Sequence, residues 1–266
     1  MKYHSYVFIM LVFWFYQDSV DELRNIFDRL DLVMDGTPAI RFEDPEVLRV
    51  LLGATVGNRS NVAGHTTVRD VDYDHDGMLT EEELAAVTTM ASRVDNNYSM
   101  FVTGYGVGNT IIETFNEFRF FTSIVTLNNS AFSWCPSLRE IILPQNIIHI
   151  GENAFLNTAI EKLIIPEGCK SCDGGLIAEN VNCKLIDFPS TMISIGDRPN
   201  NKGSLQLTVV CRAITPPTFS GSWSYNNSGK PIAIYVPDAS VSAYRTATGW
   251  SSSSSIIHPL SEYIEL

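Results

Sequence analysis

One acidic segment of the chain, residues 72–83, combines the residue types and the spacing of a cation site. Carboxylates at its first, third, fifth and twelfth positions, with a hydroxyl at the ninth and a backbone carbonyl at the seventh, are the hard oxygen ligands that Ca²⁺ prefers. Gly77 stands at the sixth position, where such a loop needs a sharp turn. The expected ligands are Asp72, Asp74, Asp76, Met78, Thr80 and Glu83. We therefore predict a calcium site here, and the alternative is a solvated acidic turn.

The end of this segment predicts a helix that would hold the loop. Thr80 and Glu83 have the spacing of a capping box, which places a helix over 81–89. Leu79 would point into the core and anchor the loop. The segment resembles an EF-hand calcium loop. Sensor EF-hands work in pairs and only one such loop is visible, so a structural calcium ion is favoured over a calcium-regulated module.

A second short helix is predicted before the acidic segment. Asp44 is a good N-cap residue and Pro45 suits the first helical position, so the helix is expected over 44–52. Val47 and Leu51 belong to its apolar face. The polar, glycine-bearing stretch 53–67 is predicted to be a loop that leads into the acidic segment.

The middle of the chain is a repeat. Pro144, Pro166 and Pro189 are 22 and then 23 residues apart, and apolar residues stand at matching offsets around each of them. This period is the signature of a leucine-rich-repeat solenoid, in which each unit must stack on its neighbours to bury its apolar side. A strand is predicted in the four residues before each proline, because proline ends a strand without leaving an unpaired donor.

Alternation along these strands sends one set of side chains outward. Several of the outward positions are apolar, which points to a contact surface, although flanking segments could equally cover them. The expected ligand-face residues are Glu140, Ile142, Lys162, Ile164 and Leu185. Glu140 and Lys162 are also a plausible ion pair between neighbouring strands.

Two segments carry a family resemblance. Residues 131–155 resemble the BspA-type leucine-rich repeat, and residues 211–250 resemble the C-terminal end piece of the same proteins. With the calcium loop, the resemblance covers residues 40–266. It implies a secreted or cell-surface protein of the Bacteroides type, with adhesion to host proteins as one known role; related modules also occur in phage and mobile-element proteins. The third repeat lacks the Ala-Phe pair of the others, so its turn is expected to be irregular.

The N-terminal 36 residues allow several interpretations. Residues 6–16 form an unbroken apolar run, which is too short for a membrane span and is followed by no small-residue cleavage site. A degenerate or uncleaved signal sequence is one interpretation. Residues 13–34 also carry apolar side chains at steps of three and four, the spacing of a coiled-coil seam, so they could form a homo-oligomer. A helix packed on its own chain is the plainer alternative.

Composition and scattered reactive residues argue against several functions. The net charge is −12, without a basic patch, which excludes a phosphate-backbone partner such as nucleic acid. Five cysteines cannot all pair, and those at Cys169 and Cys172 occupy inward repeat positions, so buried thiols are favoured over redox or zinc chemistry. The five histidines lie in no catalytic signature. We therefore predict a protein without enzymatic activity.

Together these features predict an α+β fold: a short leucine-rich-repeat solenoid preceded by a small helical EF-hand-like module. The expected units are the N-terminal segment 1–36, the calcium-binding module 37–110, the repeats 111–198 and a C-terminal cap 199–266. The predicted function is calcium-stabilised binding of a protein or glycan ligand on a host or neighbouring cell. The alternative is an oligomeric structural component of a phage or mobile-element appendage, associated with the virion.

Overall fold

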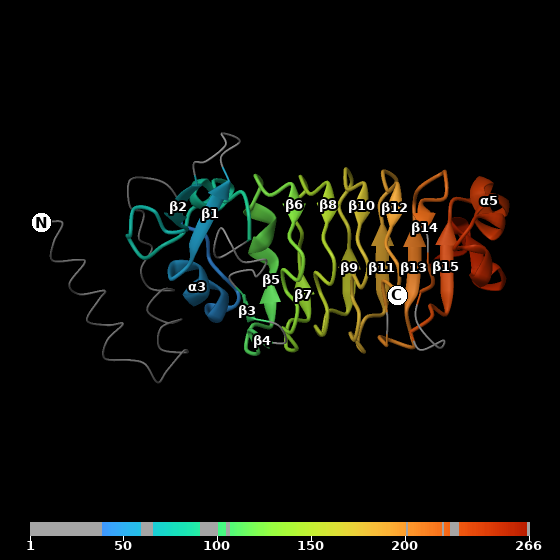
Figure 1. Cartoon of the computed structure of the whole chain (residues 1–266), viewed down its shortest axis with the longest axis horizontal. Helices are drawn as coiled ribbons and strands as arrows, with labels where there is room; N and C mark the ends of the chain where they lie inside the picture. The colour runs from blue at the N-terminus through green and yellow to red at the C-terminus, as the bar shows by residue number, and fades with distance from the viewer. Residues whose placement is uncertain are drawn as a thin grey trace, which may run out of the picture.

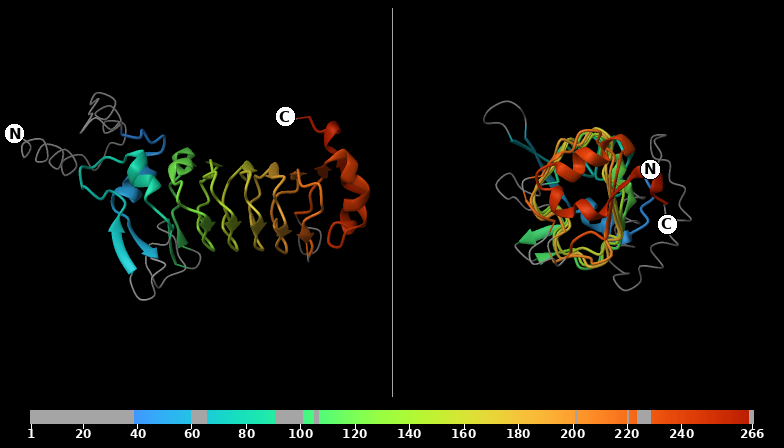
Figure 2. Two further views of the ribbon diagram at one scale, coloured as in Figure 1. Left: turned by 90° about the horizontal axis from the view of Figure 1, so that it is seen from above. Right: turned by 90° about the vertical axis from the view of Figure 1, so that its right-hand side faces the viewer.

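The computed structural model describes residues 39–59, 66–90, 101–104, 107–200, 202–219, 221–223 and 229–264. Within them a small mixed module precedes a long stack of coils that ends in short helices (Figure 1). Viewed along the long axis, the coils lie over one another (Figure 2). The apolar run 6–16 and the seam 13–34 lie outside the described residues. None of the described helices has the length and apolarity to cross a bilayer.

The first of two parallel sheets, here called sheet I, contains the strands predicted before the prolines. Its strands in spatial order are β9 (Lys162–Ile164), β11 (Leu185–Phe188), β13 (Thr208–Cys211), β15 (Ala233–Val236) and β16 (Ile257–Pro259). One coil earlier, β7 (Glu140–Ile141) pairs in parallel with β5 (Thr114–Phe115). The prolines therefore mark the strand ends as predicted, and β16 is an additional strand that the sequence did not indicate.

A second parallel sheet, sheet II, was not predicted. Its strands are only two residues long: β6 (Thr126–Leu127), β8 (His149–Ile150), β10 (Ser171–Cys172), β12 (Ser194–Ile195) and β14 (Thr218–Phe219). Each coil thus contributes one strand to each sheet, and the second residue of every sheet II strand is buried. Two-residue strands carry too little alternation for a period to be recognised.

The turns between the sheets close the third side of each coil around a stack of large side chains. Phe132 and Phe155 are fully buried and stack with ring centroids 5.7 Å apart and an interplanar angle of 4°. The expectation of an irregular third turn is wrong: Phe155 N–H donates to the carbonyl of Leu176 at 3.0 Å, as Phe132 N–H does to Ala154. Leu176 and Ile177 stand where the preceding coil has Ala154 and Phe155, and both are fully buried. One side chain is larger and the other smaller than its counterpart, and the turn is kept.

The N-terminal module contains two predicted helices and two hairpins. Its elements are α3 (Pro45–Leu52), β1 (Thr55–Arg59), β2 (Thr66–Asp70), α4 (Glu81–Ala85), β3 (Val102–Gly104) and β4 (Val107–Gly108). The helix expected over 44–52 is confirmed, with Asp44 as its N-cap. The helix after the acidic segment is shorter than expected. The prediction of a loop over 53–67 is wrong, because Thr55 and Asp70 begin and end an antiparallel hairpin.

Aromatic clusters close both ends of the stack. At the N-terminal end, the rings of Phe115 and Phe118 pack with centroids 5.2 Å apart, and Phe118 belongs to the 3₁₀ helix η1 (Asn116–Phe120). At the C-terminal end, Tyr244 and Trp250 pack at 4.9 Å and are fully buried. The cap elements there are η3 (Asp238–Ser240), α5 (Val241–Thr246), η4 (Ser251–Ile256) and η5 (Leu260–Glu262). α5 begins directly after Ser240, and the serine run 251–255 lies within η4.

Candidate functional site

The three aspartates of the acidic segment converge. One carboxylate oxygen from each of Asp72, Asp74 and Asp76 lies within 4.8 Å of the others. Hydrogen bonds within the loop fix this arrangement: Asp72 Oδ2 accepts from Gly77 N–H at 3.1 Å, and Asp76 Oδ1 accepts from Met78 N–H at 2.8 Å. Gly77 has φ +81°, which a residue with a Cβ rarely adopts, so glycine is required by conformation at this turn.

Asp72 is the buried member of this cluster. It is 6% exposed, and its Oδ1 has no hydrogen-bond partner among the described residues. Burial raises the pKa of the Asp72 carboxyl, the Gly77 N–H lowers it, and the negative charge of Asp74 raises it further. A buried carboxylate oxygen beside two further carboxylates is costly unless a cation compensates it, so this donor set fits Ca²⁺.

Glu83 lies outside that group of three and ties together the two ends of the loop. Its Oε1 accepts from Tyr73 N–H at 3.1 Å, and its Oε2 accepts from Thr80 N–H at 2.9 Å. Glu83 N–H donates in turn to Thr80 Oγ1 at 3.2 Å, which completes the predicted capping box. Burial also raises the pKa of Glu83. The described structure thus gathers three of the six predicted ligands, while Thr80, Glu83 and Met78 flank them in the same loop.

The strand edge of the loop pairs with the start of the described chain. Leu79 is 1% exposed, and its carbonyl accepts from Ile40 N–H at 2.7 Å. Ala39 and Thr80 form an antiparallel bridge beside this bond. The backbone edge of the loop at Leu79 and Thr80 is therefore occupied by the chain itself. The sequence did not predict this contact, because Ala39 and Ile40 are too short a segment to show the alternation of a strand.

Two acidic residues join the module to the first coil of the stack. Asp44 Oδ1 accepts from Glu46 N–H at 2.9 Å and caps α3, while its Oδ2 accepts from Glu113 N–H at 2.6 Å and Thr114 N–H at 3.3 Å. One residue earlier, Glu43 N–H donates to Glu117 Oε1 at 2.9 Å. The module is thus hydrogen-bonded directly to β5 and η1, and the segment that pairs with the acidic loop leads into this junction within three residues.

The predicted ligand face on sheet I is only partly open. Ile164 is 52% exposed and Ile142 is also exposed, but Leu185 is 6% exposed, so its prediction as a ligand-face residue is wrong. Toward the C-terminal end this face is covered: Arg212 holds Asp187 with two hydrogen bonds of 2.9 and 2.7 Å. On the strands beyond, Tyr263 packs against Tyr235 at 5.1 Å. Glu140 accepts from Asn116 Nδ2 at 2.9 Å, and Lys162 remains on the open face.

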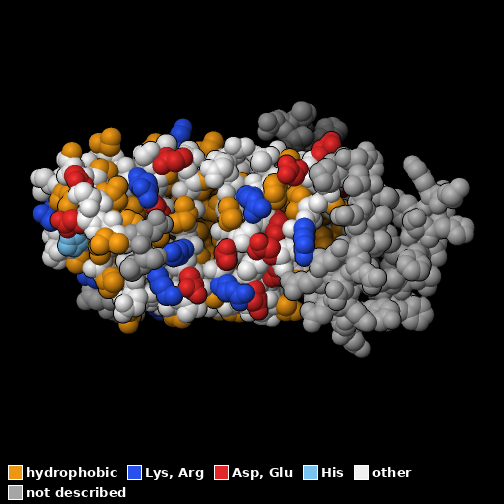
Figure 3. All heavy atoms as spheres, turned by 180° about the vertical axis from the view of Figure 1, so that it is seen from behind, with side chains coloured by type: hydrophobic (Ala, Val, Ile, Leu, Met, Phe, Trp, Pro, Cys, Tyr) orange, Lys and Arg blue, Asp and Glu red, His pale blue; other side chains and the backbone are white. Residues whose placement is uncertain are grey.

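Charged side chains of both signs are interspersed on the surface. Figure 3 shows this on one face of the stack, without a region of a single sign. Some of the charges are paired between neighbouring coils: Arg139 with Glu113, and Lys184 with Glu161 at 2.8 Å. The last pair lines a hollow of about 460 Å³ together with Val181 and Leu205, among others. Because its two charges neutralise each other, this hollow offers no free acid or base for chemistry.

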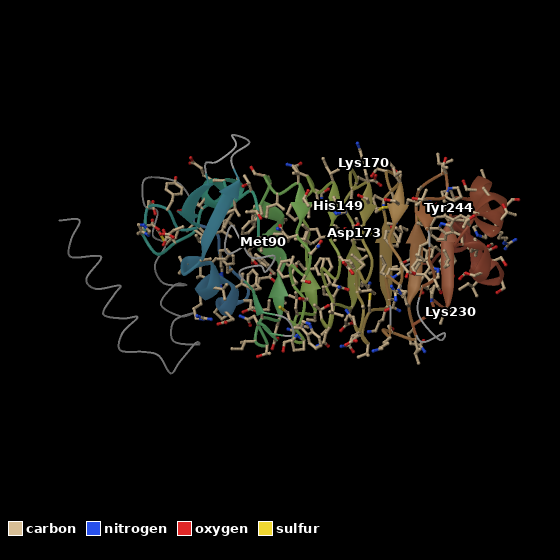
Figure 4. The ribbon with its side chains drawn as sticks, viewed as in Figure 1. Met90, His149, Lys170, Asp173, Lys230 and Tyr244 are labelled. Atoms are coloured by element: carbon tan, nitrogen blue, oxygen red, sulfur yellow. The ribbon has the colours of Figure 1, made fainter. Side chains whose placement is uncertain are left out.

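One polar trio does bring together residue types used in nucleophilic catalysis. His149 Nδ1 lies 2.8 Å from Ser171 Oγ, and its Nε2 lies 3.3 Å from an oxygen of Asp173 on the next coil (Figure 4). A hydrolase would also need free backbone donors as an oxyanion hole. The N–H groups of Ser171 and Asp173 instead donate to the carbonyls of the preceding coil. The trio therefore ties β8 to β10.

All five cysteines are buried and free, which confirms the prediction of buried thiols at Cys169 and Cys172. Burial raises the pKa of Cys135 and of Cys183 to about 12, and that of Cys169 to about 11. Burial also raises the pKa of Cys172, which lies three residues after Cys169 in the sequence. Thiols held in the neutral form by burial are poor nucleophiles and poor metal ligands.

Comparison with known families supports the repeat assignment. Residues 112–224 match the family described as BspA type Leucine rich repeat region, in six copies. No curated protein matches the chain. The matched segment includes most strands of both sheets, and families of this kind are non-catalytic interaction modules built from parallel-strand repeats. The acidic segment 72–83 lies outside the matched residues.

Proposed function

We propose that this chain, whose residues 112–224 form a BspA-like leucine-rich-repeat region, is a protein-binding module stabilised by calcium at residues 72–83. The observation that carries the calcium assignment is the buried Asp72 Oδ1, which has no partner among the described residues and belongs to a carboxylate of a convergent cluster. Asp74, Asp76, Thr80, Glu83 and the carbonyl of Met78 complete the proposed ligand set.

The electrostatics of the cluster favour a bound cation. Two unit charges no more than 4.8 Å apart repel by at least about 3.5 kcal/mol at an effective dielectric constant of ~20. Solvent screens Asp74, which is exposed, more than it screens Asp72. A divalent cation converts this repulsion into attraction and supplies a partner for Asp72 Oδ1. The folded loop is therefore expected to be more stable with Ca²⁺ than without it.

The contacts of the loop indicate how calcium would stabilise the whole molecule. The loop pairs with Ala39 and Ile40, and the chain then passes through Glu43 and Asp44, which are hydrogen-bonded to the first coil. Calcium would thereby strengthen the N-terminal cap of the stack. Because the free edge of the loop is already occupied by Ile40, these contacts support a structural ion over a calcium switch.

Calcium binding is tested with variants of the loop and a matched control. Asp72→Asn and Glu83→Gln remove ligand charge, while Glu82→Gln changes an exposed neighbour outside the proposed ligand set. In the wild type and in Glu82→Gln, Ca²⁺ at about 100 times its Kd should raise the free energy of unfolding by about 2.7 kcal/mol. Asp72→Asn should lose this response, yet be at least as stable as the wild type in chelator because it removes repulsion between the carboxylates. An undiminished calcium response in Asp72→Asn would exclude the site.

The setting of the binding function is also part of the proposal. The repeat family supports a module that acts by binding, and we infer a ligand outside the cell, on a host or neighbouring cell. Protease shaving of intact source cells tests this: release of the repeats by protease supports surface display. Full protection, together with an oligomer that is lost when residues 1–36 are removed, would favour the structural component of a phage or mobile-element appendage.

A further inference from the structure

A row of exposed aliphatic side chains runs along sheet II. The residue that precedes each of four successive sheet II strands points outward, and in chain order these are Val125, Ile148, Lys170 and Ile193. The three aliphatic members are 48%, 46% and 59% exposed. The backbone N–H of each later member donates to the carbonyl oxygen of the member before it, and all three of these bonds are 2.8 Å long. The row is therefore held in register. Aligned exposed aliphatics on a rigid surface indicate a contact surface.

Lys170 is the only charged member of this row. It makes none of the ion pairs found among the described residues, whereas Arg139, Lys184 and Arg212 on the stack are each paired with a carboxylate. Lys170 lies at the margin of the stack above His149 and Asp173, which are paired with each other (Figure 4). An unpaired ammonium group between aliphatic neighbours is complementary to a carboxylate that is itself flanked by apolar side chains.

We propose that this row, Val125-Ile148-Lys170-Ile193, is the docking surface for an amphipathic helix of a partner protein. The helix would lie along the stack and present apolar, apolar, acidic and apolar side chains on four successive turns. This inference rests on the proposed binding function and names its surface and partner class. The repeat pattern by itself indicates only the outward positions of sheet I.

The spacing of the coils selects a helix over an extended strand. Neighbouring coils are about 4.8 Å apart, so the row spans about 14 Å over three intervals. Three helical turns advance about 16 Å, which leaves a mismatch of about 2 Å at the far end. Side chains on one face of a strand repeat every ~6.8 Å, so three repeats advance about 20 Å and exceed the length of the row by about 6 Å. Helices that bind by a stripe of apolar anchors use this one-turn spacing.

The neighbouring row of sheet II supplies a polar border for such a helix. The first residues of the strands are Thr126, His149, Ser171, Ser194 and Thr218, which pair with one another across the sheet. Hydroxyl groups in this position can exchange hydrogen bonds with polar side chains at the edge of the helix. An apolar centre with a polar border is the usual arrangement of a specific protein interface.

Selection from a peptide library tests the proposal directly. The full-length protein, in calcium-containing buffer, is used to select from a displayed library of about 18-residue helical peptides with one randomised face. Selected peptides should converge on an acidic residue flanked by apolar residues at one-turn spacing. Their affinity should fall at least about tenfold for Lys170→Glu, because the substitution opposes two like charges, and a peptide with Lys in place of its acid should bind that variant instead.

Matched controls separate this surface from general stickiness. Lys230→Glu reverses another cation that forms none of the ion pairs among the described residues, and Figure 4 places it at the opposite margin of the stack. Ile164→Asp alters an exposed isoleucine of sheet I, as a control for Ile148→Asp. Both controls should leave affinity unchanged. Peptides insensitive to Lys170→Glu and Ile148→Asp, or a library that yields no binder, would overturn the helix proposal, while surface display and calcium binding would still stand on their own tests.

Discussion

The carboxylate of Asp44 is hydrogen-bonded both to the N-terminal module and to the repeat stack. Its Oδ1 caps α3 through Glu46 N–H, and its Oδ2 accepts the N–H groups of Glu113 and Thr114 at the start of β5. The side chain is buried, so water cannot easily replace these bonds. Asp44→Ala therefore removes a helix cap and an acceptor of the first coil at once.

The magnitude follows from the bonds that are lost. Removing an N-cap costs about 1 kcal/mol. The bond of 2.6 Å from Glu113 N–H is charge-assisted, and its loss costs about 2 kcal/mol, while the longer bond from Thr114 adds little. Asp44→Ala should thus lower the free energy of unfolding by about 3 kcal/mol. Asp44→Asn retains a capping oxygen but turns a donor toward Glu113 N–H, so it should cost about half as much.

Urea denaturation with hydrogen exchange distinguishes this explanation from a general loss of stability. In Asp44→Ala, the amides of Glu113 and Thr114 should exchange faster than in the wild type. The amides inside β11 and β13 should be far less affected under native conditions, because local opening at the cap does not require unfolding of the stack. A loss below about 1 kcal/mol, or unchanged exchange at Glu113, would refute the role assigned to this carboxylate.

Three further predictions concern buried groups. Glu117→Gln should stabilise the protein by about 1 kcal/mol at neutral pH but not below pH 4.5, because burial raises the pKa of Glu117 and folding therefore opposes its ionisation. Chemical denaturation at several pH values checks this. A stability difference that does not change with pH would contradict it. Phe155→Ala should cost about 4 kcal/mol, because a fully buried ring stacked on Phe132 is removed; a thermal midpoint near that of the wild type would show that the stack can close the gap. Cys135 and Cys183, with pKa values raised to about 12, should resist iodoacetamide until the chain unfolds. The free energy of unfolding should fall above pH 9, because these thiols ionise at lower pH in the unfolded chain than in the folded one. Rapid alkylation of the native protein would disprove their burial.

The repeat was predictable because its period is written in residues that must be buried. Pro144, Pro166 and Pro189 mark successive strand ends, and the apolar residues around them face the interior of the stack. Sheet II was hidden because each of its strands is only two residues long. Left-handed turn positions were equally hidden: Trp134 and Glu179 both adopt φ 60°, yet no glycine marks either place. There the stacked hydrogen bonds determine the conformation, and residue type does not.

The candidate site shows the same division between local and tertiary information. The spacing of the aspartates predicted their convergence, because a short loop brings its own side chains together. The contact of Leu79 with Ile40 could not be predicted, since the two residues are distant in sequence and neither belongs to a patterned element. Leu185 was assigned to an exposed face because alternation gives the direction of a side chain but does not reveal which other segment covers it.

The central claim, that calcium held by residues 72–83 strengthens the junction with the repeat stack, is tested most directly by hydrogen exchange with and without Ca²⁺. We expect slower exchange with Ca²⁺ at the amides of Ile40, Glu43 and Glu113, and no such change in Asp72→Asn. Calcium binding that leaves these three amides unchanged, or protection that persists in Asp72→Asn, would contradict it.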